Sequence, residues 1–433
     1  MQAPIDVDRW DPGFDASTFG AQAPQVGGAL ERLLGSDKSA SSEDCHFLNV
    51  TTPACDDSKR PVVLFIHGGA YVTGSGSMAW YDGRALAERG NIVVVTINYR
   101  LGALGFLGDR NLGTLDQISA LRWVQRNIAS FGGDPSNVTI FGESAGGSAV
   151  LSLMAAPIAD NLFHRVWALS PSILQLRNSE QGAELEQVFL DLVGTDARGM
   201  NDVSLDVLLD AQSKMPEMAG LKNFAPTDGT EAVPEPILGH VATDSRAVVI
   251  GTNRDEMLLF TAFDPTRSEW NDTVVEREFS RRFINGANAA DAYARHRPES
   301  SHSQLVSAMQ TDEVFRRPAQ RIAEQRFAAD NNTWVYEFHQ ESTAFNGLFG
   351  SCHALDLPFV FHNLGATGAD LFVGTGPGLP AVADQLCDAL IAFARTGEAP
   401  WPTFEVPTRS TQIIGPDPRV VDDPESELRE LWK

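Results

Sequence analysis

Residues 139–150 read TIFGESAGGSAV, and this stretch decides how the whole chain is interpreted. Ser144 stands between Gly142 and Gly146, after a β-branched and aromatic run and before small helix-forming residues. A G-x-S-x-G pentapeptide holds a nucleophilic serine when a strand precedes it and a helix follows. Because the chain contains 37 glycines, the pentapeptide alone would occur by chance in roughly one of five such sequences.

The flanking sequence supplies the required context. NVTIF (137–141) predicts a strand and AGGSAVLSLMAA (145–156) predicts a helix. Glycines are needed two residues to either side of the serine, because side chains there would collide in a sharp turn. The helix also directs its N-terminal dipole and the Ala145 amide at the reacting centre. We therefore predict that Ser144 is a nucleophile and not an ordinary serine in a bend.

The rest of the chain predicts an α/β fold. Apolar, β-branched runs that hardly alternate are typical of strands covered on both faces. These runs are residues 61–69, 91–100, 137–144, 165–172, 246–253 and 332–340. Amphipathic stretches at 115–133 and 381–397 predict helices that end at glycines. Strands alternating with helices predict a mostly parallel central sheet flanked by helices.

One segment breaks this alternation. Residues 173–245 contain two helix-like stretches, at 184–193 and 204–215, joined by pieces rich in Gly, Asn and Pro. We expect this excursion to form a helical cap at one end of the sheet, since α/β sheets keep their sites at the carboxyl ends of strands. Residues 1–433 contain no repeat or low-complexity linker, so we expect a single domain.

Composition excludes several classes of function. The net charge of −24 repels nucleic acids and anionic membranes. The sequence has no run of about 18 apolar residues that could span a bilayer. It also opens without a secretory signal, which predicts a cytoplasmic protein. The cysteines form no C-x-x-C pair, so we expect free thiols and no zinc site, with one disulfide left open among Cys45, Cys55, Cys352 and Cys387.

A second candidate segment is His67-Gly68-Gly69-Ala70, directly after the strand-like VVLFI. Ester hydrolysis passes through a tetrahedral oxyanion, which needs N–H donors that are already in place. A glycine-rich turn exposes backbone amides without side chains in the way. We therefore interpret this segment as an oxyanion loop, in which His67 has a structural role.

A nucleophile of this kind also needs an acid and a histidine further along the chain. Two adjacent carboxylates, Asp255 and Glu256, follow the strand-like RAVVI, and spacing alone does not choose between them. The histidines beyond this point are His296, His302, His339, His353 and His362. We favour His353, because it lies in a glycine-bounded loop after a strand-like run.

These segments resemble the type-B carboxylesterase family, the α/β-hydrolases that include bacterial carboxylesterases and the cholinesterases. The matching blocks run nearly from end to end: SSEDCHFLNV (41–50), LFIHGGAYVTGSG (64–76), NYRLGALGFL (98–107), LDQISALRWVQRNIASFGGDPSNVTIFGESAGG (115–147), GTNRDEMLLF (251–260), HALDLPFVF (353–361) and IAFARTGEAPWPTF (391–404). The resemblance is strongest to bacterial carboxylesterases. It implies an α/β-hydrolase fold and serine-dependent hydrolysis of carboxylic esters.

The resemblance also assigns roles to individual residues. It makes Glu256 the acid and His353 the base, with Asp356 of the H-x-x-[DE] block as a supporting carboxylate. Glu143, beside the nucleophile, and Asp255, beside the acid, are further supporting residues. The amides of the oxyanion hole fall on Gly69, Ala70 and Ala145. No metal and no organic cofactor is implied.

Three departures from the family pattern limit these implications. The family usually opens with a strand pair that has no counterpart here, where the sequence starts near DRWDPGF (8–14). A trimmed start, a start assigned too late and a short lineage are the open explanations, and in the first two a signal peptide would be missing with the strands. Met257 stands where a glycine is common, and we expect it to narrow the pocket beside the acid. Between Trp10 and Cys45 there is no tryptophan of the kind that binds choline, so choline esters are not the favoured substrates.

The sequence thus predicts a serine hydrolase that cleaves small to medium acyl or aryl esters through an acyl-enzyme. Its partner would be a small-molecule ester, bound by a monomer or a small homo-oligomer. One alternative is a non-catalytic binding or adhesion module on the same fold, which is disfavoured because such relatives lose the nucleophile. The other is an amide, carbamate or lactone hydrolase, which would use the same residues.

Overall fold

The computed structural model describes residues 2–5, 15–27, 40–215, 217–218, 221–222 and 224–433. The amino-terminal stretch DRWDPGF (8–14) therefore lies outside the described residues. The core is a nine-stranded sheet in the order β1-β3-β2-β4-β5-β8-β9-β10-β11. All neighbours are parallel except for the outermost pairs, β1 with β3 and β10 with β11.

The six predicted strands form the centre of this sheet. The strands are β1 Leu48–Thr51, β2 Arg60–Ile66, β3 Val93–Ile97, β4 Gly133–Glu143, β5 Arg165–Leu169, β8 Ala247–Asn253, β9 Thr333–Phe338, β10 Ser410–Ile414 and β11 Arg419–Asp422. The prediction of a mostly parallel sheet flanked by helices is therefore confirmed. The edge strands β1, β10 and β11 were not predicted.

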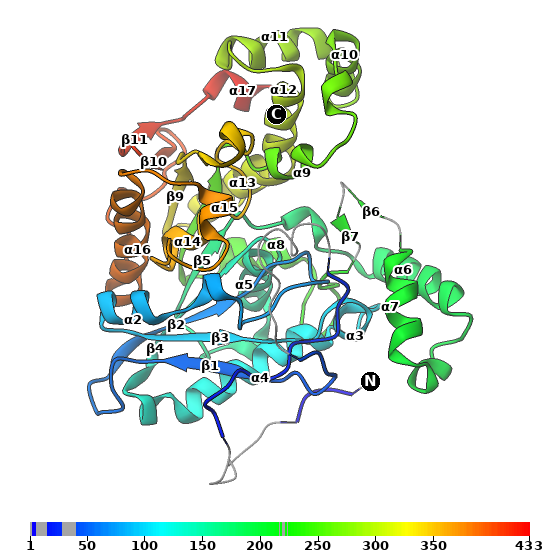
Figure 1. Cartoon of the computed structure of the whole chain (residues 1–433), viewed down its shortest axis with the longest axis vertical. Coiled ribbons are helices and arrows are strands. Elements are labelled where there is room, and N and C mark those ends of the chain that lie inside the picture. Colours follow the sequence, from blue (N-terminus) through cyan, green and yellow to red (C-terminus); the bar gives the residue numbers. More distant parts are fainter. Residues whose placement is uncertain (1, 6–14, 28–39, 216, 219–220, 223) are drawn as a thin grey trace.

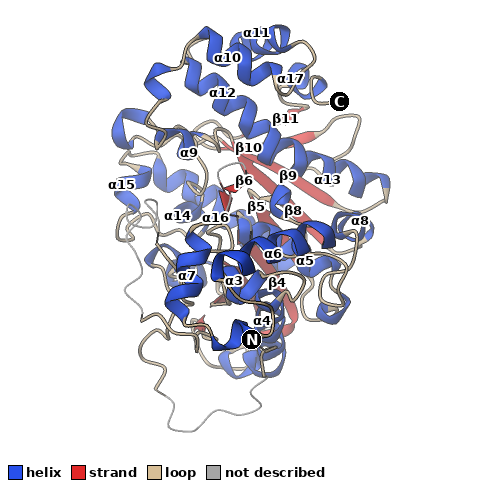
Figure 2. Ribbon diagram, turned by 90° about the vertical axis from the view of Figure 1, so that its right-hand side faces the viewer, coloured by secondary structure: helices blue, strands red, loops and turns tan. Residues whose placement is uncertain are grey.

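Helices cover both faces of the sheet, as Figures 1 and 2 show. Along β2, Val62 and Leu64 pack into one apolar layer, while Val63 and Phe65 pack into the other. Side chains of a strand alternate between faces, so a sheet covered on both sides needs apolar residues at every position. The sheet helices are α2 Arg84–Gly90, α3 Gly102–Phe106, α4 Leu112–Asn127, α5 Ala145–Ala155, α8 Ile237–Thr243, α13 Arg317–Ala328, α14 Leu357–Val360 and α16 Leu379–Thr396.

The two predicted amphipathic helices are α4 and α16. α4 ends before a short 3₁₀ turn at Ile128–Phe131, and Gly132 follows in the left-handed conformation. α16 ends at Gly397, which also has a left-handed conformation (φ 81°). α16 therefore ends at its predicted glycine, whereas α4 ends at Asn127 and the 3₁₀ turn separates it from Gly132.

The excursion at 173–245 contains α6 Ser179–Val193 and α7 Leu205–Ser213, which lie together to one side of the sheet in Figure 1. A two-stranded hairpin follows, of β6 Glu217–Met218 and β7 Leu221–Lys222. α8 then returns to the sheet layer, where it packs against α5 and α13. The single domain and the cap role of this excursion stay predictions.

A separate group of helices has its own apolar core. α10 Asp272–Ser280, α11 Gly286–His296, α12 His302–Thr311 and α17 Ser426–Glu430 share buried residues such as Phe279 and Leu428. They lie at the top of Figure 1, beyond α9 Leu258–Ala262 and α15 Ala369–Val373. None of the helices that the structure describes combines the length and the apolar character needed to cross a bilayer.

Candidate active site

Ser144 lies on the sharp turn between β4 and α5. Its backbone has φ 58° and ψ −118°, a conformation that side-chain-bearing residues rarely adopt and that is concentrated at functional sites. A Cβ at Gly142 would lie 2.4 Å from the carbonyl oxygen of Gly146, and a Cβ at Gly146 would lie 1.9 Å from that of Ile66. The two glycines are therefore required by the backbone atoms of the turn and of β2.

The glycine-rich loop after β2 lies against this turn. A Cβ at Gly68 would come within 3.1 Å of the Ser144 Cβ. Gly69 and Ala70 both have positive φ values, of 98° and 53°. The amides of Gly69, Ala70 and Ala145 find no hydrogen-bond acceptor in the described part of the chain. Backbone donors without a partner beside a serine hydroxyl are suited to bind an oxyanion.

His67 is buried at the start of this loop. Its ring stacks on Tyr99, with centroids 4.5 Å apart, and its Nδ1 lies 2.8 Å from the carbonyl oxygen of Gly68. Burial lowers the pKa of His67 to about 4, so the ring is neutral at physiological pH. This geometry is that of the structural residue expected from the sequence.

The structure brings His353 and Glu256 together. Nδ1 of His353 lies 2.7 Å from Oε2 of Glu256, and the proton of this bond sits on Nδ1 because a carboxylate only accepts. The other carboxylate oxygen accepts the backbone N–H of Asn253 at 2.7 Å. Glu256 is fully buried. Both oxygens of Glu256 are thus fixed, and with them the tautomer of the imidazole.

The opposite ring nitrogen faces Glu143. Nε2 of His353 lies 3.1 Å from Oε1 of Glu143, as an ion-pair approach and not as an aligned hydrogen bond. Among the described residues, no hydrogen bond joins the Ser144 hydroxyl to His353. Catalytic hydrogen bonds often become aligned only when substrate is bound.

Buried carboxylates control the charge of this site. Burial disfavours the imidazolium of His353, but the carboxylates of Glu143 and Glu256 outweigh it and raise the pKa of His353 to about 9. Burial likewise raises the pKa of Glu143 to about 8. Asp356 is also fully buried, and its burial and the charge of Glu256 raise its pKa to about 7. Perturbed groups clustered in this way are typical of catalytic sites.

Asp255, the neighbour of Glu256, has different partners. Its carboxylate pairs with Arg254 at 2.6 Å, and it accepts the backbone N–H of Ser351 at 3.0 Å. Asp255 therefore anchors the loop that carries His353 and does not contact the imidazole. The side-chain amide of Asn253 donates a hydrogen bond to Oδ1 of Asp356 at 3.4 Å.

The remaining candidate histidines lie in ion pairs elsewhere. Their carboxylate partners are Glu427 for His296, Asp272 for His302, Glu337 for His339 and Asp384 for His362. The described residues contain no cluster of three or more His, Cys, Asp or Glu side chains that could hold a metal ion. All four cysteines are free, and only Cys55 is exposed.

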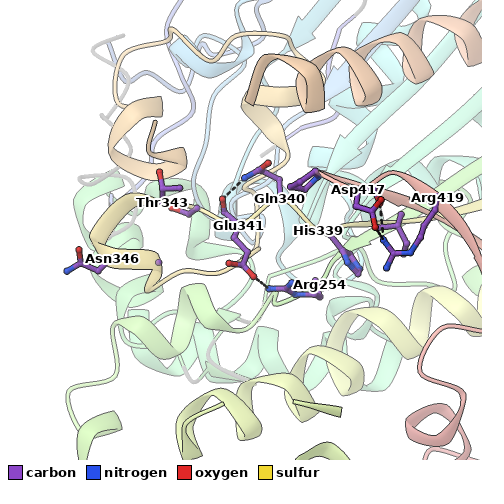
Figure 3. A pocket seen from close by; sticks show the side chains of 12 residues that line it. Arg254, His339, Gln340, Glu341, Thr343, Asn346, Asp417 and Arg419 are labelled. Carbon is purple, nitrogen blue, oxygen red and sulfur yellow. Dashed lines mark hydrogen bonds and ion pairs between the residues drawn. The ribbon is translucent and has the colours of Figure 1, made fainter. Parts of the chain in front are cut away.

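A hollow of about 650 Å³ opens beyond the carboxyl ends of β8, β9 and β10 (Figure 3). Its basic side chains each have an acidic partner within the chain: Arg254 has Glu341, Arg419 has Asp417, and His339 has Glu337. None of the predicted site residues lines this hollow. It therefore adds no residue to the candidate site.

Sequence reasoning missed two residues that contact the predicted triad. Asn253 holds Glu256, and its position three residues before the acid in GTNRDE was an available local signal. Phe315 packs on the His353 ring, with centroids 4.7 Å apart. It lies far from the other site residues in sequence, so no local pattern could have identified it.

Comparison with known proteins identifies the family of the chain. Residues 1–418 match the model of the carboxylesterase family. The para-nitrobenzyl esterase of Bacillus subtilis is 34% identical over 99% of this chain and 91% of its own length. The phenmedipham hydrolase of Pseudarthrobacter oxydans is 33% identical over 94% of this chain and 86% of its own.

Solved structures give the same assignment. A carboxylesterase of Geobacillus stearothermophilus superposes with a TM-score of 0.83 at 34% identity, covering 96% of this chain and 89% of that protein. A structure of a PNB esterase covers 100% of this chain and 92% of its own, with a TM-score of 0.80 at 34% identity. The chain belongs to the carboxylesterase family of carboxylic ester hydrolases.

Proposed function

We propose that the protein hydrolyses carboxylic esters with Ser144 as nucleophile, His353 as general base and Glu256 as the acid that orients the histidine. The observation that supports this best is the bond of 2.7 Å between His353 and the fully buried Glu256, beside a serine held at φ 58°. Asp255 is occupied by Arg254, which favours Glu256 for this role.

The reaction follows from these positions. When an ester enters, Nε2 of His353 turns from Glu143 to the Ser144 hydroxyl and takes its proton as the oxygen attacks the ester carbonyl. Glu256 stabilises the imidazolium that forms. His353 then gives the proton to the departing alkoxide, which leaves as the alcohol. A water molecule, activated by the same histidine, hydrolyses the acyl-enzyme and releases the acid.

The oxyanion formed in each step needs N–H donors. We assign this role to the amides of Gly69, Ala70 and Ala145, each typically worth about 3–4 kcal/mol of the barrier. Ala145 begins α5, so its amide also lies at the positive end of a helix dipole. Nucleophile, base and donors all come from the chain, so the proposed reaction uses no metal and no organic cofactor.

Small to medium acyl and aryl esters are the proposed substrates, with the excursion at 173–245 as a cap over the site. The name of the Bacillus subtilis relative, a para-nitrobenzyl esterase, supports an aromatic alcohol side. The Pseudarthrobacter oxydans relative is named as a hydrolase of phenmedipham.

The test is hydrolysis of p-nitrophenyl esters from acetate to decanoate, with Ser144→Ala and His353→Gln measured in parallel. We expect turnover by the wild-type protein and none above background in either variant, with both folds retained by circular dichroism. The chain-length profile would then give the size of the acyl pocket. A folded Ser144→Ala variant that keeps its activity would reject this triad.

A further inference from the structure

A small apolar cluster lies beside the proposed base, separate from the two large cores that cover the sheet. Met257, Val314 and Phe315 are its buried members, and Phe260 packs against it. The Phe315 ring lies 4.7 Å from the His353 ring between centroids, at an angle of 37°. The Phe260 ring lies 5.5 Å away at 39°. The imidazole therefore has an aromatic wall.

An unusual stretch of helix carries the nearer ring. Asp312–Arg316 forms a π-helical turn between α12 and α13. Such turns are rare and appear frequently at functional sites. Within this turn, the Arg316 guanidinium donates to Oδ1 of Asp312 at 2.5 Å and forms an ion pair with Glu337 of β9 at 3.3 Å. It also donates to the backbone carbonyl oxygen of Arg254 at 2.7 Å.

The same turn is attached to the loop that carries the acid. The backbone N–H of Met257 donates to Oγ1 of Thr311 at 3.1 Å, and the Met257 side chain packs with Phe315. Phe315 is 1% exposed, so its ring has little room to move. Phe315 and Glu256 are therefore placed by one connected set of contacts.

His353 needs such a wall because a single hydrogen bond to Glu256 leaves its ring free to tilt. Its Nε2 lies 3.1 Å from Oε1 of Glu143. The proposed reaction requires the same nitrogen to face the hydroxyl of Ser144 instead. A misplacement of about 1 Å in a reacting group can lower the rate about 100-fold.

We propose that Phe315, whose ring packs with Met257, is a positioning residue that keeps the His353 ring in the plane from which Nε2 reaches Ser144. This inference rests on the proposed function, in which His353 is the base. It assigns Phe315 an effect on the histidine and not on the substrate, so its loss lowers kcat and leaves KM unchanged.

The experiment compares Phe315→Leu, Phe315→Tyr and Val314→Ala with the wild-type protein on p-nitrophenyl acetate. Phe315→Leu keeps an apolar side chain but removes the flat ring, and we expect kcat to fall by about 10- to 100-fold with KM within about twofold. Phe315→Tyr retains the ring and should keep most of kcat. Val314→Ala is the matched control: it removes apolar volume from the same cluster but leaves the Phe315 and Phe260 rings present, so it should lower the melting temperature and preserve kcat.

Three results would overturn the inference. Unchanged kcat in Phe315→Leu would show that the wall is not needed. An equal loss of kcat in Val314→Ala would show that cluster packing in general, and not the ring, is responsible. A rise in KM with kcat preserved would place Phe315 in the substrate pocket. Failure of the triad itself is distinguishable, because His353→Gln would then stay active.

Discussion

The imidazole of His353 is held between two glutamates, with Nδ1 2.7 Å from Glu256 and Nε2 3.1 Å from Glu143. Both carboxylates favour the imidazolium, and they outweigh the burial that disfavours it. The proposed base is therefore protonated, and inactive, over a wider pH range than an isolated histidine, whose pKa is about 6.5. Because Glu143 titrates in the same region, the apparent pKa belongs to the pair.

The pH profile of kcat/KM should reflect this arrangement. Neutral His353 is the active form, so activity should rise with pH through the raised pKa of His353, about 9, and level off only above that value. Glu143→Gln removes one carboxylate that favours the imidazolium. The rising, acid limb of the kcat/KM profile should therefore shift to lower pH by on the order of one pH unit. The measurement is p-nitrophenyl ester hydrolysis between about pH 6 and 10, corrected for spontaneous hydrolysis.

The control for this profile is Glu398→Gln, which removes a carboxylate at an exposed position beyond α16. Its acid limb should coincide with that of the wild-type protein. Coincident limbs for the wild-type protein and Glu143→Gln would mean that Glu143 does not set the protonation of the base.

The adjacent carboxylates Asp255 and Glu256 should respond differently to the same change. Glu256→Gln keeps the shape but loses the charge that orients and stabilises the imidazole, so kcat should fall by about 10⁴-fold. Asp255→Asn loses its ion pair with Arg254 at 2.6 Å, which affects the loop and not the ring. It should lower the melting temperature while kcat stays within a few-fold. Comparable kcat losses in both variants would contradict this division of roles.

Sequence patterns predicted the central sheet because each of its strands is buried on both faces. β3, VVVTI, is buried along its whole length, and such a run has few alternative structures. β11 is different: three of its four residues are exposed, and it forms only by pairing with β10. Edge strands of this kind carry little apolar signal, so they could not be predicted from composition.

The site was predictable where its chemistry is local. Ser144 and the loop around Gly69 follow directly from strand ends and glycines. The choice between Asp255 and Glu256 required the resemblance, because neighbouring side chains point in different directions and the partner of each lies far away in sequence. The contact of Phe315 with His353 depends on the π-helical turn, which no sequence pattern indicates.

The cysteines should behave as four free thiols of unequal reactivity. Cys55 is exposed, whereas Cys45, Cys352 and Cys387 are buried. Burial raises the pKa of Cys45 and of Cys387 to about 12, which suppresses their thiolates. A thiol reagent should therefore modify one cysteine in the native protein, and all four in denaturant without reductant. Recovery of only two thiols in denaturant would reveal a disulfide.

The turn at Ser144 should not tolerate a side chain at Gly146. A Cβ there would lie 1.9 Å from the carbonyl oxygen of Ile66, which belongs to β2 in the middle of the sheet and cannot yield. We expect Gly146→Ala to lower the free energy of unfolding by about 3 kcal/mol or more, as an overpacked core does. Urea unfolding measures this, with Gly378→Ala as control because a Cβ at that position meets nothing within 4 Å. Equal urea midpoints for Gly146→Ala and Gly378→Ala would mean that the backbone of the turn can move to admit a side chain. A turn that moves in this way could not hold Ser144 at φ 58°.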